Sequence, residues 1–190
     1  MDELIYGVWK GRAYDNRRTI DGKAPEGLPL SEFLAFNSGN PVAGFAGPQG
    51  FLMFDNRVTL ADVLLSYYKR VRELACGRCT PCRAGGVMIV EALEAACEGR
   101  GSEVDWERIR DIALQMKETS LCGIGLTTPE PILGALEHFP ELLVNAPVMP
   151  ATQRDFISVA TAPCIEACPA KVNVPRYIDY IRDGHPELAT

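Results

Sequence analysis

The chain has 190 residues, of which 47% are hydrophobic and 23% charged, and its formal net charge at pH 7 is -6. This composition is typical of a folded protein, and the length fits one domain with a fragment of another. The negative charge argues against a nucleic-acid-binding protein. No apolar run approaches the roughly 18 residues of a membrane helix, and the acidic start lacks the apolar core of an export signal. We therefore expect a cytoplasmic protein without a membrane span.

The first 58 residues predict a small β-containing lead-in with long loops. Two short apolar pieces, Leu4–Trp9 and Gly50–Phe54, have the composition of strands. Between them, residues 37–41 contain Asn, Gly and Pro in an order typical of a turn.

Residues 59–146 predict a helical domain, and their short connections favour an antiparallel four-helix bundle. The first helix begins at Thr59, a good N-cap, and Asp62 completes a capping box in which Asp replaces the usual Glu. Apolar residues at helical spacing predict a second helix over 86–97, a third over 105–118 and a fourth from Pro129 to Leu143. The predicted fold class is therefore mainly α, with a cysteine-rich loop between the first two helices.

Residues 147–190 predict a linker and the start of another unit. No helical period is visible from 149 to 163, whereas Cys164 and Cys168 form a C-x₃-C-P motif before an amphipathic piece. Because the chain ends soon after this piece begins, we expect a fragment whose next domain lies beyond Thr190. Two thiols cannot hold a cubane cluster, so a second cluster at Cys164 and Cys168 would need ligands from outside the chain.

Seven cysteines are too few for a disulfide scaffold, and in a reducing cytoplasm clustered cysteines indicate metal ligands or catalytic thiols. Cys76, Cys79 and Cys82 stand at i, i+3 and i+6 in a loop with Gly and Pro that can aim three thiols at one point. Cys122 follows the second and third predicted helices, and an antiparallel hairpin of these helices would return it to the loop. Four thiolates are what a [4Fe–4S] cluster requires.

Two other functions remain open on the residues alone. A Cys₄ zinc module with an interaction role is the first, although zinc sites usually present two two-cysteine knuckles rather than a run of three with one remote partner. A thiol-redox enzyme is the second, and it needs an exposed thiol of low pKa. Cys97 lies on the apolar stripe of the second helix and is expected to be a small hydrophobic residue rather than a ligand. His138 is expected on a helix surface.

The glycines and basic residues around the cysteines have two interpretations each. Gly77, Gly123 and Gly125 either aim backbone N–H groups at inorganic sulfides, which would raise the reduction potential, or serve turn geometry alone. Basic side chains near the cysteines either stabilise a reduced cluster and guide an acidic partner or cover a solvated helix face. The residues concerned are Lys69, Arg70, Arg72, Arg78 and Arg83.

The stretches Gly50–Asp55, Cys76–Gly85 and Ser120–Gly125 resemble the C-terminal iron–sulfur region of the NADH-binding flavoprotein subunit of respiratory complex I. The resemblance covers about residues 45–143. It implies that Cys76, Cys79, Cys82 and Cys122 bind a [4Fe–4S] cluster that takes electrons from a flavin. The flavin- and NADH-binding domain that precedes this region in complex I has no counterpart in residues 1–50, so this chain is expected to bind neither FMN nor NADH.

Residues 164–178 are similar to the start of the iron–sulfur domain of the glutamate synthase small subunit, which precedes FAD- and NADPH-binding Rossmann domains. The order of the two pieces resembles an NADPH oxidoreductase beta subunit. This implies FAD and NADPH sites only in a downstream domain, and partners that are other redox subunits, such as a ferredoxin-like protein. The expected function is an electron-transfer domain that relays single electrons through a [4Fe–4S] cluster between a flavin elsewhere and a partner or acceptor. No catalytic residue is expected in the chain itself.

Overall fold

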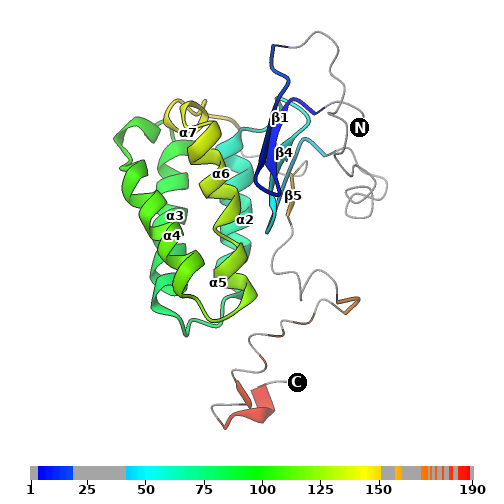
Figure 1. Cartoon of the computed structure of the whole chain (residues 1–190), viewed down its shortest axis with the longest axis vertical. Coiled ribbons are helices and arrows are strands. Elements are labelled where there is room, and N and C mark those ends of the chain that lie inside the picture. The colour runs from blue at the N-terminus through cyan, green and yellow to red at the C-terminus, as the bar shows by residue number, and fades with distance from the viewer. Residues whose placement is uncertain are drawn as a thin grey trace.

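The computed structural model describes residues 4–18, 42–150, 157–159 and, nearer the C-terminus, residues 168–170, 172, 174, 177, 180, 181 and 184–188. The predicted turn at 37–41 lies outside these residues. The described chain forms two layers, in which a sheet lies beside a set of helices (Figure 1). None of the helices in this part of the chain has the length and apolarity needed to cross a bilayer.

The sheet has five strands in the order β2-β1-β4-β3-β5. Strands β1 and β2, β1 and β4, and β3 and β4 pair antiparallel, whereas β3 and β5 pair parallel. Val8 and Phe51 belong to the main core with the helices, and their neighbours Trp9 and Leu52 belong to a second apolar cluster, as the alternation of a strand requires. The strands are β1 (Tyr6–Trp9), β2 (Arg12–Asp15), β3 (Gly44–Gly47), β4 (Gly50–Met53) and β5 (Ile157–Val159).

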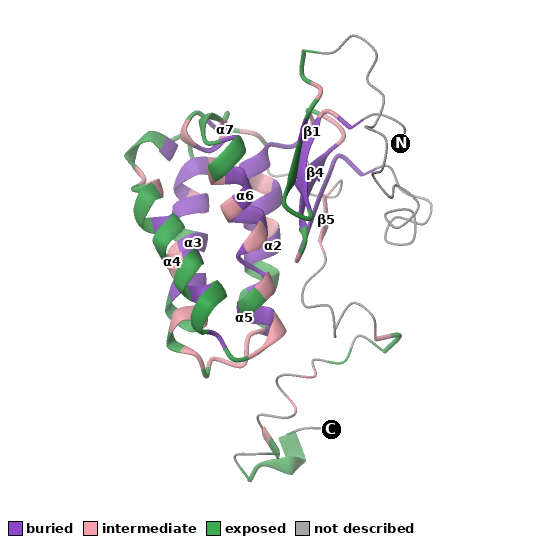
Figure 2. Ribbon diagram, viewed as in Figure 1, coloured by how far each residue is buried: buried purple, intermediate pink, exposed green. Residues whose placement is uncertain are grey.

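The helical layer packs on the sheet through α2 and α6. Figure 2 shows buried residues on the inner sides of α2, α3 and α6, and exposed residues on the outer side of α4. A fourth predicted helix is present but broken, because α6 ends before Phe139 and α7 starts after Pro140. The helices are α2 (Leu60–Leu74), α3 (Thr80–Cys97), α4 (Trp106–Thr119), α5 (Gly123–Thr127), α6 (Glu130–His138) and α7 (Glu141–Val144), with short 3₁₀ turns at Gly101–Glu103 and Pro186–Leu188.

The N-terminus of α2 confirms the predicted capping box. The Asp62 backbone N–H donates to Thr59 Oγ1 at 3.1 Å, and the Thr59 N–H donates to Asp62 Oδ2 at 3.2 Å. Two free N–H groups at the start of the helix are thereby satisfied, which fixes where α2 begins. The predicted third helix is also confirmed, because the Asp105 side chain accepts from the Arg108 N–H and α4 begins at Trp106.

The prediction of a mainly α fold was too narrow, because the chain is mixed α/β. Strand β3 contains two glycines and β5 has only three residues, so neither shows the alternation by which strands are recognised. Strand β5 also lies inside the stretch 149–163 that was predicted to be a linker. Helix α3 begins at Thr80 rather than near residue 86, since Pro81 is well suited to a first helical turn.

Helices α3 and α4 pack tightly against each other at Gly85. A Cβ atom added there would lie 2.8 Å from Ile112 Cγ2 and 2.8 Å from Met116 Sδ, whereas one added at Gly86 would meet only Arg72 Cγ at 3.6 Å. Gly85 lies one helical turn after Cys82, and Met116 lies one turn before Ser120. The close contact therefore sets the separation of the two chain segments that carry cysteines.

We expect Gly85→Ala and Gly86→Ala to change stability in opposite directions. Alanine favours a helix over glycine by about 0.5–1 kcal/mol, and at Gly86 that gain is unopposed. At Gly85 the added methyl group crowds Ile112 and Met116, and overpacking costs about 1–3 kcal/mol. Urea unfolding followed by circular dichroism measures both. Equal stabilisation by the two substitutions would contradict the tight packing of α3 on α4.

Candidate iron–sulfur site

Four cysteines from different parts of the chain line one pocket at the end of the helical layer where α5 lies (Figure 1). Cys76 is in the loop after α2, Cys79 is the N-cap residue of α3, and Cys82 is in the first turn of α3. Cys122 is the N-cap residue of α5, directly beyond α4. The hairpin of α3 and α4 therefore returns Cys122 to the other three cysteines, as the sequence predicts.

The loop between α2 and α3 is shaped by one glycine and one arginine. Gly77 has a φ of 84°, a left-handed conformation that residues with a side chain rarely adopt. The Arg83 guanidinium reaches back from α3 and donates from Nη1 to the Gly77 carbonyl oxygen at 3.0 Å. This contact closes the loop over the start of α3 and holds Cys76 and Cys79 near Cys82. A structural role in the turn is thus assigned to Gly77.

The thiols are close enough to influence one another electrostatically. Burial, and then the negative charges that Cys122, Cys79 and Cys76 would carry, raise the pKa of Cys82 to about 11. Without cations the Cys82 thiol therefore stays protonated at neutral pH. A reactive thiol in a dithiol enzyme needs a lowered pKa, so Cys82 does not have the properties of a redox-active thiol. Metal ions between the sulfurs would offset the repulsion among the thiolates and so favour loss of the Cys82 proton.

The start of α3 offsets part of this repulsion. Its first turn contains no acidic residue, and no side chain caps its backbone N–H groups. The partial positive charge of a helix N-terminus favours anions within the first turn. For Cys82, burial and the neighbouring thiols outweigh this effect, because its pKa is raised rather than lowered. The helix end nevertheless suits thiolates that are already bound to metal.

The donor set fits an iron–sulfur cluster better than a single zinc ion. Three of the four thiols that line the pocket come from one short run and the fourth comes from beyond α4, whereas a Cys₄ zinc site usually draws its ligands from two two-cysteine knuckles. Each thiolate of a cubane binds a different iron, so a cluster needs four thiolates around one cavity. The pocket also contains a buried hydroxyl, Ser120 Oγ, that makes no hydrogen bond within the described residues. Cluster sulfurs would give that hydroxyl an acceptor.

Ser120, Ile124 and Gly125 also line the pocket, and sequence reasoning did not assign Ser120 or Ile124 to the site. Ile124 is 1% exposed and brings apolar surface against the sulfurs. The available signal was position, because all three residues lie within three positions of Cys122.

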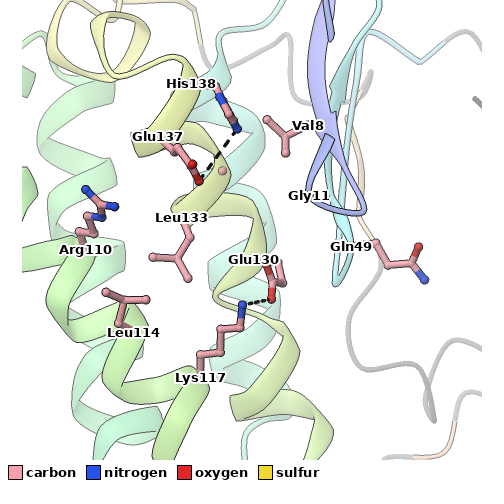
Figure 3. Close-up of a pocket in the computed structure, with 11 residues that line it drawn as sticks. Val8, Gly11, Gln49, Arg110, Leu114, Lys117, Glu130, Leu133, Glu137 and His138 are labelled. Atoms are coloured by element: carbon pink, nitrogen blue, oxygen red, sulfur yellow. Dashed lines mark ion pairs between the residues drawn. The ribbon is translucent and has the colours of Figure 1, made fainter. Parts of the chain in front are cut away.

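The other residues considered from the sequence lie elsewhere. Cys97 ends α3 and is partly buried against the core, as expected of a small hydrophobic residue. His138 is at the exposed end of α6 and lines a different cavity of about 170 Å³, which no cysteine lines (Figure 3). In that cavity Lys117 pairs with Glu130 at 2.7 Å and His138 approaches Glu137 at 4.0 Å. Cys168 is partly exposed, and Cys164 lies outside the described residues.

The helix hairpin and its cysteine pocket define an electron-transfer iron–sulfur domain. Residues 62–146 match the family described as the NADH-ubiquinone oxidoreductase-F iron-sulfur binding region. The resemblance to complex I noted from the cysteine motif is thereby confirmed.

Similar proteins are redox subunits. The chain is 29% identical over 187 residues to the NADPH-Fe(3+) oxidoreductase subunit beta of Geobacter sulfurreducens. This match covers 96% of the present chain and 27% of the relative. The chain is 28% identical over 226 residues to the NADP(+)-dependent formate dehydrogenase subunit beta of Moorella thermoacetica, covering 98% and 31%. An NADH-quinone oxidoreductase subunit of Aquifex aeolicus is 31% identical over 98 residues, covering 52% and 23%. The chain thus spans less than a third of the length of these relatives.

Proposed function

We propose that Cys76, Cys79, Cys82 and Cys122 are the ligands of the [4Fe–4S] cluster of this domain. The proposal rests chiefly on one observation: four thiols from the α2–α3 loop, α3 and the start of α5 line a single pocket. When bound, the cluster supplies one-electron chemistry. The chain supplies the thiolates, the helix end that favours their charge, and apolar side chains that limit water near them.

The residues around the proposed ligands keep the site rigid. Arg83 braces the loop through the Gly77 carbonyl, and the packing at Gly85 fixes α3 against α4. Tyr68, which is fully buried, donates from Oη to the Thr128 carbonyl oxygen at 2.7 Å and so ties α2 to the end of α5. Ligands held in this way need to move little when an electron arrives, which suits a relay.

We further propose that the electrons reach this domain from a flavin outside it. Relatives of the chain carry NADPH, NADP(+) or NADH in their names, and this supports an NAD(P)H-linked oxidoreductase. FAD and NADPH would be bound by a domain downstream of the present residues, and Cys164 and Cys168 would contribute to a second cluster there. Another redox subunit, such as a ferredoxin-like protein, would exchange electrons with the cluster.

The surface beside the cysteines suits contact with such a partner. Leu121, next to Cys122, is 80% exposed, and Arg78 and Arg83 lie on the exposed surface of the loop and of α3. The exposed apolar side chain can be buried against a partner, and the basic side chains beside it favour a partner with an acidic surface. This basic surface is local, because the overall charge of the chain is negative. Electron transfer needs only a short-lived contact close to the cluster.

Anaerobic reconstitution with iron and sulfide tests the function. We expect four iron and four sulfide per chain, a broad absorbance band in the visible spectrum, and an EPR signal that appears on one-electron reduction. Zinc bound at one ion per chain, with no sulfide and with a fold unchanged in air, would favour the zinc module instead. Rapid alkylation of Cys82 at neutral pH would support the thiol-redox alternative.

A further inference from the structure

One buried side chain in the cysteine pocket has no role in the proposed ligand set. Ser120 is 8% exposed and lines the pocket with the cysteines. Its Oγ is shielded from solvent and has no hydrogen-bond partner within the described residues. Burying a hydroxyl without a partner costs folding free energy, and a redox role or a bound group is among the reasons why a native protein keeps such a hydroxyl.

Nearby hydroxyl groups show that the local backbone could have satisfied this one. Thr119 and Thr127 donate to the carbonyl oxygen four residues earlier, at 2.6 and 2.7 Å, and Thr128 does the same. At Thr128 the Ile124 carbonyl oxygen accepts both the hydroxyl and the backbone N–H, whereas at Ser120 the Met116 carbonyl oxygen accepts only the backbone N–H, at 3.2 Å. The Ser120 hydroxyl is thus left for an acceptor in the pocket.

The absence of a side chain at Gly125 leaves room for this hydroxyl. A Cβ atom at Gly125 would lie 2.2 Å from Ser120 Oγ and 3.5 Å from Cys82 Cβ. The serine side chain therefore occupies the space that a side chain at residue 125 would need, directly beside Cys82. Ser120 also precedes Cys122 by two residues, and it lines the same pocket as Cys82 and Cys122.

We infer that Ser120 donates a hydrogen bond from Oγ to a sulfur of the cluster or of its cysteine ligands, and that this bond raises the reduction potential. The inference rests on the proposed function. An added electron increases the negative charge on the sulfurs, so a donor stabilises the reduced state more than the oxidised state. Ser120 is then a residue that sets the potential, not one that binds iron.

The test compares Ser120→Ala with Thr119→Ala in the reconstituted chain. Thr119 is the matched control, because it is the adjacent hydroxyl residue, is exposed, and donates to Gln115 rather than into the pocket. In an EPR-monitored redox titration, Ser120→Ala should lower the ratio of reduced to oxidised cluster at a fixed potential about tenfold, which is about 59 mV for one electron. Thr119→Ala should match the wild type. Gly125→Ala, whose methyl group displaces the hydroxyl, should shift the potential in the same direction.

A second readout follows the proton itself. In the reduced wild type, exchange into D₂O should reveal by ENDOR an exchangeable proton coupled to the cluster, and Ser120→Ala should lose that coupling. Equal potentials in wild type and Ser120→Ala, each with four iron and four sulfide, would overturn the inference and leave the proposed function intact. Failure of Ser120→Ala alone to load would also overturn it, since the hydroxyl would then be needed to build the site. A wild type that loads no cluster would overturn both.

Discussion

Replacing Cys122 by alanine is expected to abolish assembly of the [4Fe–4S] cluster. Cys122 reaches the pocket from the far end of the α3–α4 hairpin, and no other cysteine in the described residues lines that side. A cubane held by only three thiolates exposes one iron, and such a cluster should break down in air. The bound iron should therefore fall from about four per chain to near zero after gel filtration in air. Iron and sulfide analysis with the visible spectrum gives the result.

Cys97→Ala is the matched control for this prediction. It makes the same substitution in the same chain, but Cys97 ends α3 at a distance from the pocket and packs against the core. We expect it to keep four iron and four sulfide, with only the small stability change of a shortened, partly buried side chain. A Cys122→Ala protein that retains a stable, oxygen-resistant cluster equal to that of Cys97→Ala would show that residue 122 is not a ligand.

Replacing Gly50 by alanine is expected to destabilise the fold by about 4 kcal/mol or more, which is exceptional for one methyl group. Gly50 pairs with Trp9 in β1 and Gly47 in β3, and its φ is 137°, a region that residues with a side chain rarely enter. A Cβ atom there would lie 1.9 Å from the Val8 carbonyl oxygen. Since that oxygen is backbone, it can move only if the β1–β4 pairing is broken.

Gly11→Ala separates the cost of the positive φ from the cost of the clash with a neighbouring strand. Gly11 also has a positive φ, 73°, but a Cβ atom there would meet nothing within 4 Å. We expect it to cost about 1–2 kcal/mol, the usual penalty of a left-handed conformation. Urea unfolding of both variants, with the cluster bound, measures the difference. If the two substitutions lowered the free energy of unfolding equally, this would contradict a close approach of β1 and β4 at Gly50.

The parts of the fold that were predictable are those whose signal is local. Thr59 and Asp62 identified the start of α2 because a capping box depends only on residues three apart. The return of Cys122 to the other cysteines was also predictable, because two helices joined by a short connection pack antiparallel whatever their detailed contacts. Both needed only spacing along the chain.

The missed features depend on contacts between distant residues. Strand β5 is defined by its pairing with β3, and three residues in isolation carry no period. The early start of α3 was hidden because Gly85 and Gly86 lower helix propensity, and only the packing against α4 shows why Gly85 is required. Likewise, nothing in the sequence distinguishes the hydroxyl of Ser120 from those of its threonine neighbours, since the difference lies in the hydrogen bonds that each hydroxyl makes in the folded chain.

The most direct test is crystallography of the anaerobically reconstituted chain at the iron absorption edge. The central claim predicts a compact group of iron peaks inside the pocket, each iron bonded to one of the Sγ atoms of Cys76, Cys79, Cys82 and Cys122. A single metal peak without sulfide, or iron bound away from these four residues while their loops remain ordered, would contradict it.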